Sequence, residues 1–182
     1  NNPKTFMNEL SLEEIKKITL KLPQSIINVN FTGGEPFARK DINEIAISYF
    51  ENTSIESIFI TSNGSLPDRM IKFCEIITSK FPLKKLYFSM SIDDFSDKHN
   101  KIRKLDNLFN KCIKVYHELR QISKNIQTNI AITVSHENYN NVTNLYKTLK
   151  EKYNIKTITA ILAREEGVYK IESHNKLKIS KA

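Results

Sequence analysis

Five short apolar runs in the sequence each end in residues that can do chemistry. Hydroxyl, amide, carboxylate or glycine groups follow the runs, at residues 32–36, 61–64, 91–94, 135–138 and 163–167. If the runs are parallel β-strands, their carboxyl ends lie along one edge of the sheet, where α/β proteins place their binding sites. The sequence therefore predicts one polar site assembled from these segments.

The first segment, Gly33-Gly34-Glu35, suits a ligand that carries an ammonium group. Glycine has no side chain, so a ligand can reach the backbone N–H and C=O groups of Gly33 and Gly34. The Glu35 carboxylate can accept a charge-assisted hydrogen bond from a cation. A tight strand-to-helix turn with Glu35 on the surface explains the same residues without a ligand.

The third segment places a hydroxyl and a carboxylate two residues apart. Ser91 and Asp93 should therefore point to the same face of a strand, where they suit a ribose or a carboxylate-bearing ligand. An N-cap for the next helix is the alternative role for Asp93. Further on, His99 and Arg103 are four residues apart on one helix face, and a surface pair is their ordinary interpretation.

The basic residues point to anion contacts at a few places only. The 182 residues carry a formal net charge of +8, and 23 of the 28 basic residues are lysines scattered along the chain. Three of the five arginines, Arg39, Arg103 and Arg164, follow expected strands, where a planar guanidinium suits a fixed anion. The shortage of arginine argues against a nucleic-acid binder.

Two cysteines, Cys74 and Cys112, match neither a zinc pattern nor a disulfide framework, and no metal ligand set is assigned. Both fall in helical patterns, so we expect buried free thiols. Without a signal segment at its start, the chain is expected in the reducing cytoplasm. No apolar stretch approaches the roughly 18 residues of a membrane span, so no membrane partner is expected.

The periodicity of the sequence predicts alternating helices and strands. Helices are expected from the capping box at Ser11, from a cap-like start at Asp41, and over residues 67–80, 98–123 and 138–152. Strands are expected over residues 26–31, 57–62, 85–92, 127–134 and 156–162. This alternation indicates an α/β fold with a parallel sheet of about five strands, an open or partial barrel.

Two of the segments resemble motifs of the radical S-adenosylmethionine (SAM) enzymes. Residues 31–36, Phe-Thr-Gly-Gly-Glu-Pro, look like that family's Gly-Gly-Glu-Pro element. Residues 61–64, Thr-Ser-Asn-Gly, look like its Thr-x-Asn-Gly element. Both stand in the family's order, each after a strand.

The second half of the chain continues the resemblance. Residues 91–93, Ser-Ile-Asp, with His99 and Arg103 downstream, are similar to the family's Ser-x-Asp-Gly…His…Arg segment. Residues 133–138 resemble its fifth-strand region. The likeness covers roughly residues 9–167 and is nearest to the peptide-modifying and cofactor-building branch, which often carries a SPASM-like, cysteine-rich extension.

The resemblance implies a fold and a chemistry. It implies a TIM-like partial (βα)6 barrel without its first strand, with residues 1–167 as the core and 168–182 as a tail or the start of a further segment. It also implies a [4Fe–4S] cluster that cleaves SAM reductively, giving a 5′-deoxyadenosyl radical that abstracts hydrogen from a substrate.

The resemblance also implies roles for residues at the strand ends. The methionine part of SAM would be bound by Gly33, Gly34, Glu35 and Arg103. Ser91 would bind the ribose or carboxylate. The remaining cofactor contacts would come from a supporting pair, Ser62 and Asn63, and from two residues flanking adenine, Val134 and Leu162. Two residues would face the substrate, a catalytic Asp93 and a substrate-binding Arg164.

Two departures from the family pattern matter. The family's Cys-x3-Cys-x2-Cys loop is missing, so we expect this chain to be a fragment that lacks the cluster ligands and is inactive alone. Asp94 stands where glycine is usual and Phe95 where proline is common, so the family's tight turn after Asp93 is not expected to carry over unchanged.

The partners follow from the same resemblance. They are SAM, a peptide or small-molecule substrate, and a reductant such as flavodoxin or ferredoxin. Two other functions stay open: a cluster-free α/β domain that binds a nucleotide or a partner, and a basic module for RNA or another anion. An upstream cysteine motif in the parent gene supports the enzyme over the first alternative, and salt-dependent RNA binding is required for the second.

Overall fold

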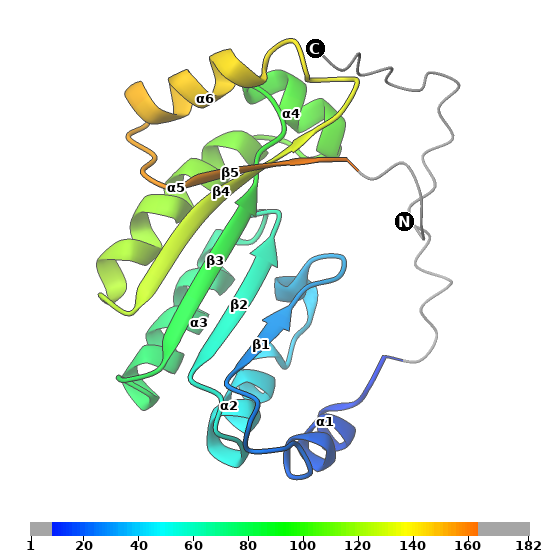
Figure 1. Cartoon of the computed structure of the whole chain (residues 1–182), viewed down its shortest axis with the longest axis vertical. Helices are drawn as coiled ribbons and strands as arrows, with labels where there is room; N and C mark the ends of the chain where they lie inside the picture. Colours follow the sequence, from blue (N-terminus) through cyan, green and yellow to red (C-terminus); the bar gives the residue numbers. More distant parts are fainter. Residues whose placement is uncertain (1–8, 164–182) are drawn as a thin grey trace.

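A parallel β-sheet with helices packed on it organises residues 9–163, the part of the chain that the computed structural model describes (Figure 1). The strands are β1 (Asn28–Phe31), β2 (Ser57–Ser62), β3 (Lys85–Ser91), β4 (Ile126–Val134) and β5 (Ile158–Leu162). The helices are α1 (Leu12–Thr19), η2 (Pro36–Ala38, a 3₁₀-helix), α2 (Ile42–Asn52), α3 (Pro67–Lys80), α4 (Ser96–Arg103), α5 (Leu108–Ile122) and α6 (Val142–Glu151). None of these helices is long and apolar enough to cross a membrane.

The strands pair in chain order, β1-β2-β3-β4-β5, and every pair is parallel. This sheet confirms the predicted α/β fold and is consistent with a partial TIM-like barrel. The expected tail at residues 168–182 lies outside the described residues. Because all the strands run the same way, their carboxyl ends meet at one edge of the sheet.

The two faces of the sheet differ in burial. Along β2, Ile58 and Ile60 are buried, whereas Phe59 and Thr61 are exposed, as the two-residue period of a strand requires. Helices α2, α3 and α5 cover the face that buries the isoleucines (Figure 1). The other face, here called the open face, carries Phe59 and Thr61.

Helix starts follow the local signals in two of three cases. The Ser11 capping box forms with Glu14, and Pro67 opens α3, both as predicted. Asp41 precedes α2, but its side chain makes no capping hydrogen bond. It accepts instead from the Arg39 Nε at 2.8 Å, so the prediction of a side-chain cap was wrong because a stronger charged partner is adjacent.

The long helix predicted over residues 98–123 is two helices, α4 and α5. Lys104 ends α4 in the left-handed region, with φ of 55°, and Asn107 has φ of 54°. The Asn100 Oδ1 accepts a hydrogen bond from the Phe109 N–H, which joins the end of α4 to the start of α5. Asparagine tolerates left-handed backbone, so this break is compatible with the sequence although the apolar period hides it.

Candidate functional site

The loop after β1 presents bare backbone. Gly33 has φ of +128°, a conformation that residues with side chains rarely adopt. Gly34 has an ordinary backbone, and a Cβ added at either glycine would have nothing within 4 Å. The peptide groups of this loop are therefore accessible to a ligand, as expected.

Glu35 joins this loop to the end of β2. Its carboxylate accepts hydrogen bonds from the Ser62 hydroxyl at 2.9 Å, the Asn63 N–H at 2.7 Å and the Phe37 N–H at 3.1 Å. These donors come from the end of β2 and from η2, so they fix the carboxylate in space. Ser62 and Asn63 thus lie where a supporting role was predicted for them.

Gly64 lets α5 pack against the end of β2. It has φ of +72°, and a Cβ added there would lie 2.6 Å from the Cys112 Sγ. The Cys112 thiol contacts the Asn63 carbonyl at 3.1 Å and the Ser91 carbonyl at 3.9 Å. One buried side chain of α5 therefore touches the ends of both β2 and β3.

Gly64→Ala is expected to destabilise the fold by about 2–4 kcal/mol, because it adds a steric clash to an unfavourable backbone conformation. Urea unfolding followed by circular dichroism measures the change. Gly34→Ala is the matched control, since its Cβ enters open space at an ordinary φ. Equal stability of the two variants would contradict the packing of Cys112 on Gly64.

Asp93 is the most heavily bonded residue at the end of β3. Its carboxylate accepts from the Arg103 Nε at 2.6 Å and from the Thr133 N–H at 3.4 Å. The Asp93 side chain is 8% exposed and that of Arg103 is 33% exposed. The geometry favours a carboxylate that positions Arg103, and it leaves part of the guanidinium accessible; the catalytic role of Asp93 stays a prediction.

The turn after Asp93 is built with side-chain contacts. Asp94 accepts from the Phe95 N–H at 2.8 Å and pairs with Lys98 at 2.6 Å. These contacts orient the start of α4 without glycine or proline. Phe95, not Asp93, is the N-cap residue of α4, so the alternative role of Asp93 as a helix cap is wrong.

Asn138 joins the ends of β3 and β4. Its side-chain amide donates to the Asp93 carbonyl at 2.6 Å and to the Thr133 carbonyl at 2.8 Å, and its Oδ1 accepts from the Ser135 N–H at 2.7 Å. Asn138 is 2% exposed. The helix predicted from residue 138 begins only at Val142, because Asn138 lies in this hydrogen-bonded turn.

His99 is fully buried, so the surface-pair interpretation of His99 and Arg103 is wrong. Its Nδ1 accepts from the Asp93 N–H at 3.2 Å, and within residues 9–163 its Nε2 has no hydrogen-bond partner. Burial lowers the pKa of His99 from 6.5 to about 4, and Arg103 adds to this, while Asp93 and Asp94 oppose it. The ring is therefore neutral at pH 7 and holds the Asp93 backbone.

The His99 pKa makes stability depend on pH. Between pH 6.5 and about 4 the unfolded chain binds a proton that the folded chain does not, so the free energy of unfolding falls as the pH is lowered through this range. We expect His99→Gln to reduce this fall by about 1 kcal/mol between pH 7 and 5. Urea midpoints at both pH values measure it.

The exposed His136 provides the control variant, His136→Gln, which removes a histidine from the surface. A direct check is an NMR titration of the His99 ring in the unmodified chain. A His99 pKa near 6.5 would contradict the burial described here.

The other predicted site residues are not all placed at the strand ends and free to bind a ligand. Val134 and Leu162 are register partners at the ends of β4 and β5, so they lie side by side. Ser91 is half-buried at the end of β3. Arg39 is engaged by Asp41 and by the Leu10 carbonyl, so it is not a free anion contact. Arg164 lies outside the described residues.

The structure thus links two clusters into what we call the strand-end site. The first holds Glu35 with Ser62 and Asn63, beside the open Gly33-Gly34 backbone. The second holds Asp93 with Arg103. Cys112 touches Asn63 of the first cluster and Ser91, two residues before Asp93. Sequence reasoning missed the joining roles of Cys112 and Asn138, although the apolar period of α5 and the polar residues after β4 were visible signals.

The thiols are poorly suited to metal binding. Cys74 and Cys112 are free and buried, as predicted, and burial raises the pKa of both, to about 12 at Cys112. Both thiols therefore stay protonated at neutral pH. Within residues 9–163, no three His, Cys, Asp or Glu side chains are grouped to hold a metal ion.

Two known proteins are similar in sequence to parts of this chain. The chain is 27% identical over 150 residues to the Fe-coproporphyrin III synthase of Methanosarcina barkeri (strain Fusaro / DSM 804), covering 81% of this chain and 35% of that protein. It is 41% identical over 56 residues to the GTP 3',8-cyclase of Cronobacter sakazakii (strain ATCC BAA-894), covering 30% of this chain and 17% of that protein. The chain therefore spans 35% or less of the length of these relatives.

A family model also matches most of the chain. The model described as the Radical SAM superfamily covers residues 2–149, which include both clusters of the strand-end site. These matches do not separate the peptide-modifying branch from others, and that branch stays a prediction. The chain belongs to the radical SAM superfamily.

Proposed function

We propose that this chain binds SAM across the strand-end site, for reductive cleavage to a 5′-deoxyadenosyl radical that abstracts hydrogen from a substrate. The observation that carries the proposal is the open Gly33-Gly34 backbone beside a Glu35 carboxylate fixed by donors at the end of β2 and in η2. Bare peptide groups next to an oriented carboxylate suit an amino-acid ammonium and its neighbouring atoms.

Members of the superfamily use SAM together with a [4Fe–4S] cluster, which supplies the electron for cleavage. The printed sequence has two cysteines, and both are buried and protonated. Such thiols do not fit the cluster, which needs several accessible thiolates. We therefore assign the residues of the strand-end site to SAM binding. We assign no reaction step to a cluster held by Cys74 or Cys112. The two free thiols support a reducing compartment, the cytoplasm.

In this proposal Glu35 attracts the ammonium group of SAM. Its three donors use three of the roughly four lone-pair sites of a carboxylate, which leaves one for the ligand. Gly33 and Gly34 offer peptide groups to the same part of SAM. Ser62 and Asn63 act as positioning residues, because they hold the carboxylate rather than the ligand.

Residues at the other end of the site would contact the carboxylate, the ribose and the adenine of SAM. Arg103, which Asp93 orients through Nε, has its terminal nitrogens for the SAM carboxylate. Ser91 offers a hydroxyl to the ribose or the carboxylate. Val134 and Leu162 lie side by side and provide apolar contacts for adenine.

For the substrate and the reductant we propose chemical classes. The two relatives are named for different compounds, Fe-coproporphyrin III and GTP. We therefore propose the shared step, hydrogen abstraction from a small molecule or a peptide, with Asp93 and Arg164 facing it. Flavodoxin or ferredoxin is the proposed class of electron donor.

Calorimetric titration of the chain with SAM tests the binding proposal. Gly34→Val should weaken SAM binding by about tenfold or more, because the new side chain fills the space above the loop without touching the fold. Ala38→Val is the matched control, since Ala38 is exposed on η2 beside the same loop. Equal affinities for SAM in the two variants would refute the proposed site.

A further inference from the structure

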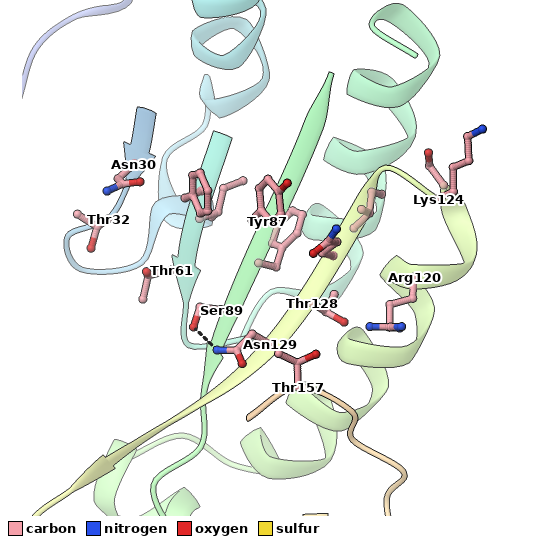
Figure 2. Close-up of a pocket in the computed structure, with 16 residues that line it drawn as sticks. Asn30, Thr32, Thr61, Tyr87, Ser89, Arg120, Lys124, Thr128, Asn129 and Thr157 are labelled. Carbon is pink, nitrogen blue, oxygen red and sulfur yellow. Dashed lines mark hydrogen bonds between the residues drawn. The ribbon is translucent and has the colours of Figure 1, made fainter. Parts of the chain in front are cut away.

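The open face of the sheet holds a pocket of about 850 Å³ below the strand-end site (Figure 2). Side chains from the first four strands line it, among them Asn30, Phe59, Tyr87 and Asn129. Phe59 lies three residues before Ser62, so the pocket floor is about 10 Å from the strand ends at the usual rise of a strand. A molecule in this pocket would lie directly under one bound at the strand ends.

The pocket floor carries a stacked pair of aromatic rings. The rings of Phe59 and Tyr87 are register partners on β2 and β3, stacked with centroids 4.5 Å apart and planes 9° apart. Each ring covers one face of the other, and Phe59 is 40% exposed, so the pair presents ring edges and outer ring faces to the pocket. A third planar ring can extend this stack on an outer face or pack against the ring edges.

The wall toward β5 is polar but uncharged. The Asn129 Nδ2 donates to the Ser89 Oγ at 3.2 Å and to the Thr159 Oγ1 at 2.9 Å (Figure 2 shows the contact with Ser89). Ser89 lines the pocket, and its hydroxyl proton is free to turn toward a ligand. The Asn129 Oδ1 is buried and has no hydrogen-bond partner within residues 9–163.

The charges at the pocket have one sign. The described residues that line it include no aspartate or glutamate, but they include Arg120 and Lys124 near the end of α5. The β4–β5 pairing starts at Ile130, so the first part of β4 has no β5 neighbour, and the pocket extends past it toward the two cations (Figure 2). The Arg120 guanidinium lies 5.6 Å from the centre of the Tyr116 ring, which restrains it. An anion is favoured here and an ammonium is not.

We propose that this pocket binds an aromatic ring that carries an anionic group, with the ring packed against the stacked pair of Phe59 and Tyr87 and the anion toward Arg120 and Lys124. Only the assignment of this molecule as the substrate rests on the proposed function. Its binding to the pocket needs neither SAM nor a cluster. The ring chemistry has two sources, a free aromatic acid or an aromatic residue in an acidic peptide.

Ligand-observed NMR and calorimetry on the chain test ring and charge separately. Naphthalene-2-carboxylate should bind about tenfold more tightly than 2-naphthylmethylammonium and than cyclohexanecarboxylate. A blocked peptide with tyrosine next to glutamate tests the peptide source against 4-hydroxyphenylacetate, the free source. Tighter binding of either one assigns the source, and binding of neither overturns the proposal.

Variants locate the binding. Phe59→Ala and Phe59→Leu should weaken the binding of naphthalene-2-carboxylate by about tenfold. Tyr87→Phe keeps the stacked rings and should leave this affinity unchanged. Arg120→Ala with Lys124→Ala should abolish the preference for the anion. Tyr146→Ala, an exposed tyrosine on α6, is the control and should change nothing.

The outcomes separate this inference from the proposed function. Phe59→Ala should leave SAM affinity unchanged. If the unmodified chain does not bind SAM, the proposed function is wrong, but the naphthoate measurements still test the pocket. If the ammonium probe binds as well as the carboxylate, or if Phe59→Ala has no effect on naphthoate, the pocket proposal is wrong.

Discussion

Asn138→Ala is expected to destabilise the chain by about 2–4 kcal/mol and to weaken SAM binding. The substitution removes three hydrogen bonds and leaves the Asp93 and Thr133 carbonyls without that partner in a buried place. The effect is large because a buried acceptor that loses its donor keeps its full desolvation cost. Urea unfolding and SAM calorimetry measure the two consequences.

Asn140→Ala is the matched control for this substitution. Asn140 lies two residues away and is exposed, so its replacement should change stability by less than about 0.5 kcal/mol. If Asn138→Ala is equally mild, the turn after β4 is not held to the end of β3 as the structure indicates. If it destabilises without altering SAM affinity, Asn138 is structural only.

Loss of the Asp93 carboxylate should have the second large effect. Asp93→Asn weakens a 2.6 Å charged contact with Arg103, and we expect a loss of about 2–3 kcal/mol, less than for a fully buried pair because Arg103 is partly exposed. SAM affinity should fall as well, since the guanidinium loses its orientation.

A double-mutant cycle separates the pair from its surroundings. Arg103→Gln and the double variant with Asp93→Asn complete the cycle, and the coupling energy should be at least about 1 kcal/mol in stability. SAM affinity should be equally low in Arg103→Gln and in the double variant. A coupling near zero would show that Asp93 is important for a reason other than Arg103.

Much of the fold could be predicted from the sequence because local and tertiary signals agree. The strand at residues 57–62 was predicted to the residue, since a buried apolar run ends there in Asn63-Gly64. The cap at Ser11 and the start at Pro67 also formed as expected. The break between α4 and α5 was missed because it depends on the Asn100 side chain, which reaches across to Phe109.

The sequence was enough to predict which residues lie at the site. It was not enough to predict which of their atoms form hydrogen bonds and ion pairs. Placing polar groups at strand ends follows from parallel topology alone, and Glu35, Ser62 and Asn63 do meet. Which atoms pair depends on distances between segments far apart in sequence. Glu35 contacts β2, Asp93 contacts Arg103, and Asn138 contacts β3, and no local pattern carries that information.

Backbone amide NMR of the labelled chain during a millimolar SAM titration is the most direct test of the central claim. Saturable shifts are expected at residues 33–35, 63–64, 91–93 and 134, with little change at the amino-terminal ends of the strands. Shifts confined to other surfaces, or none at saturating SAM, would contradict a SAM site at the strand ends.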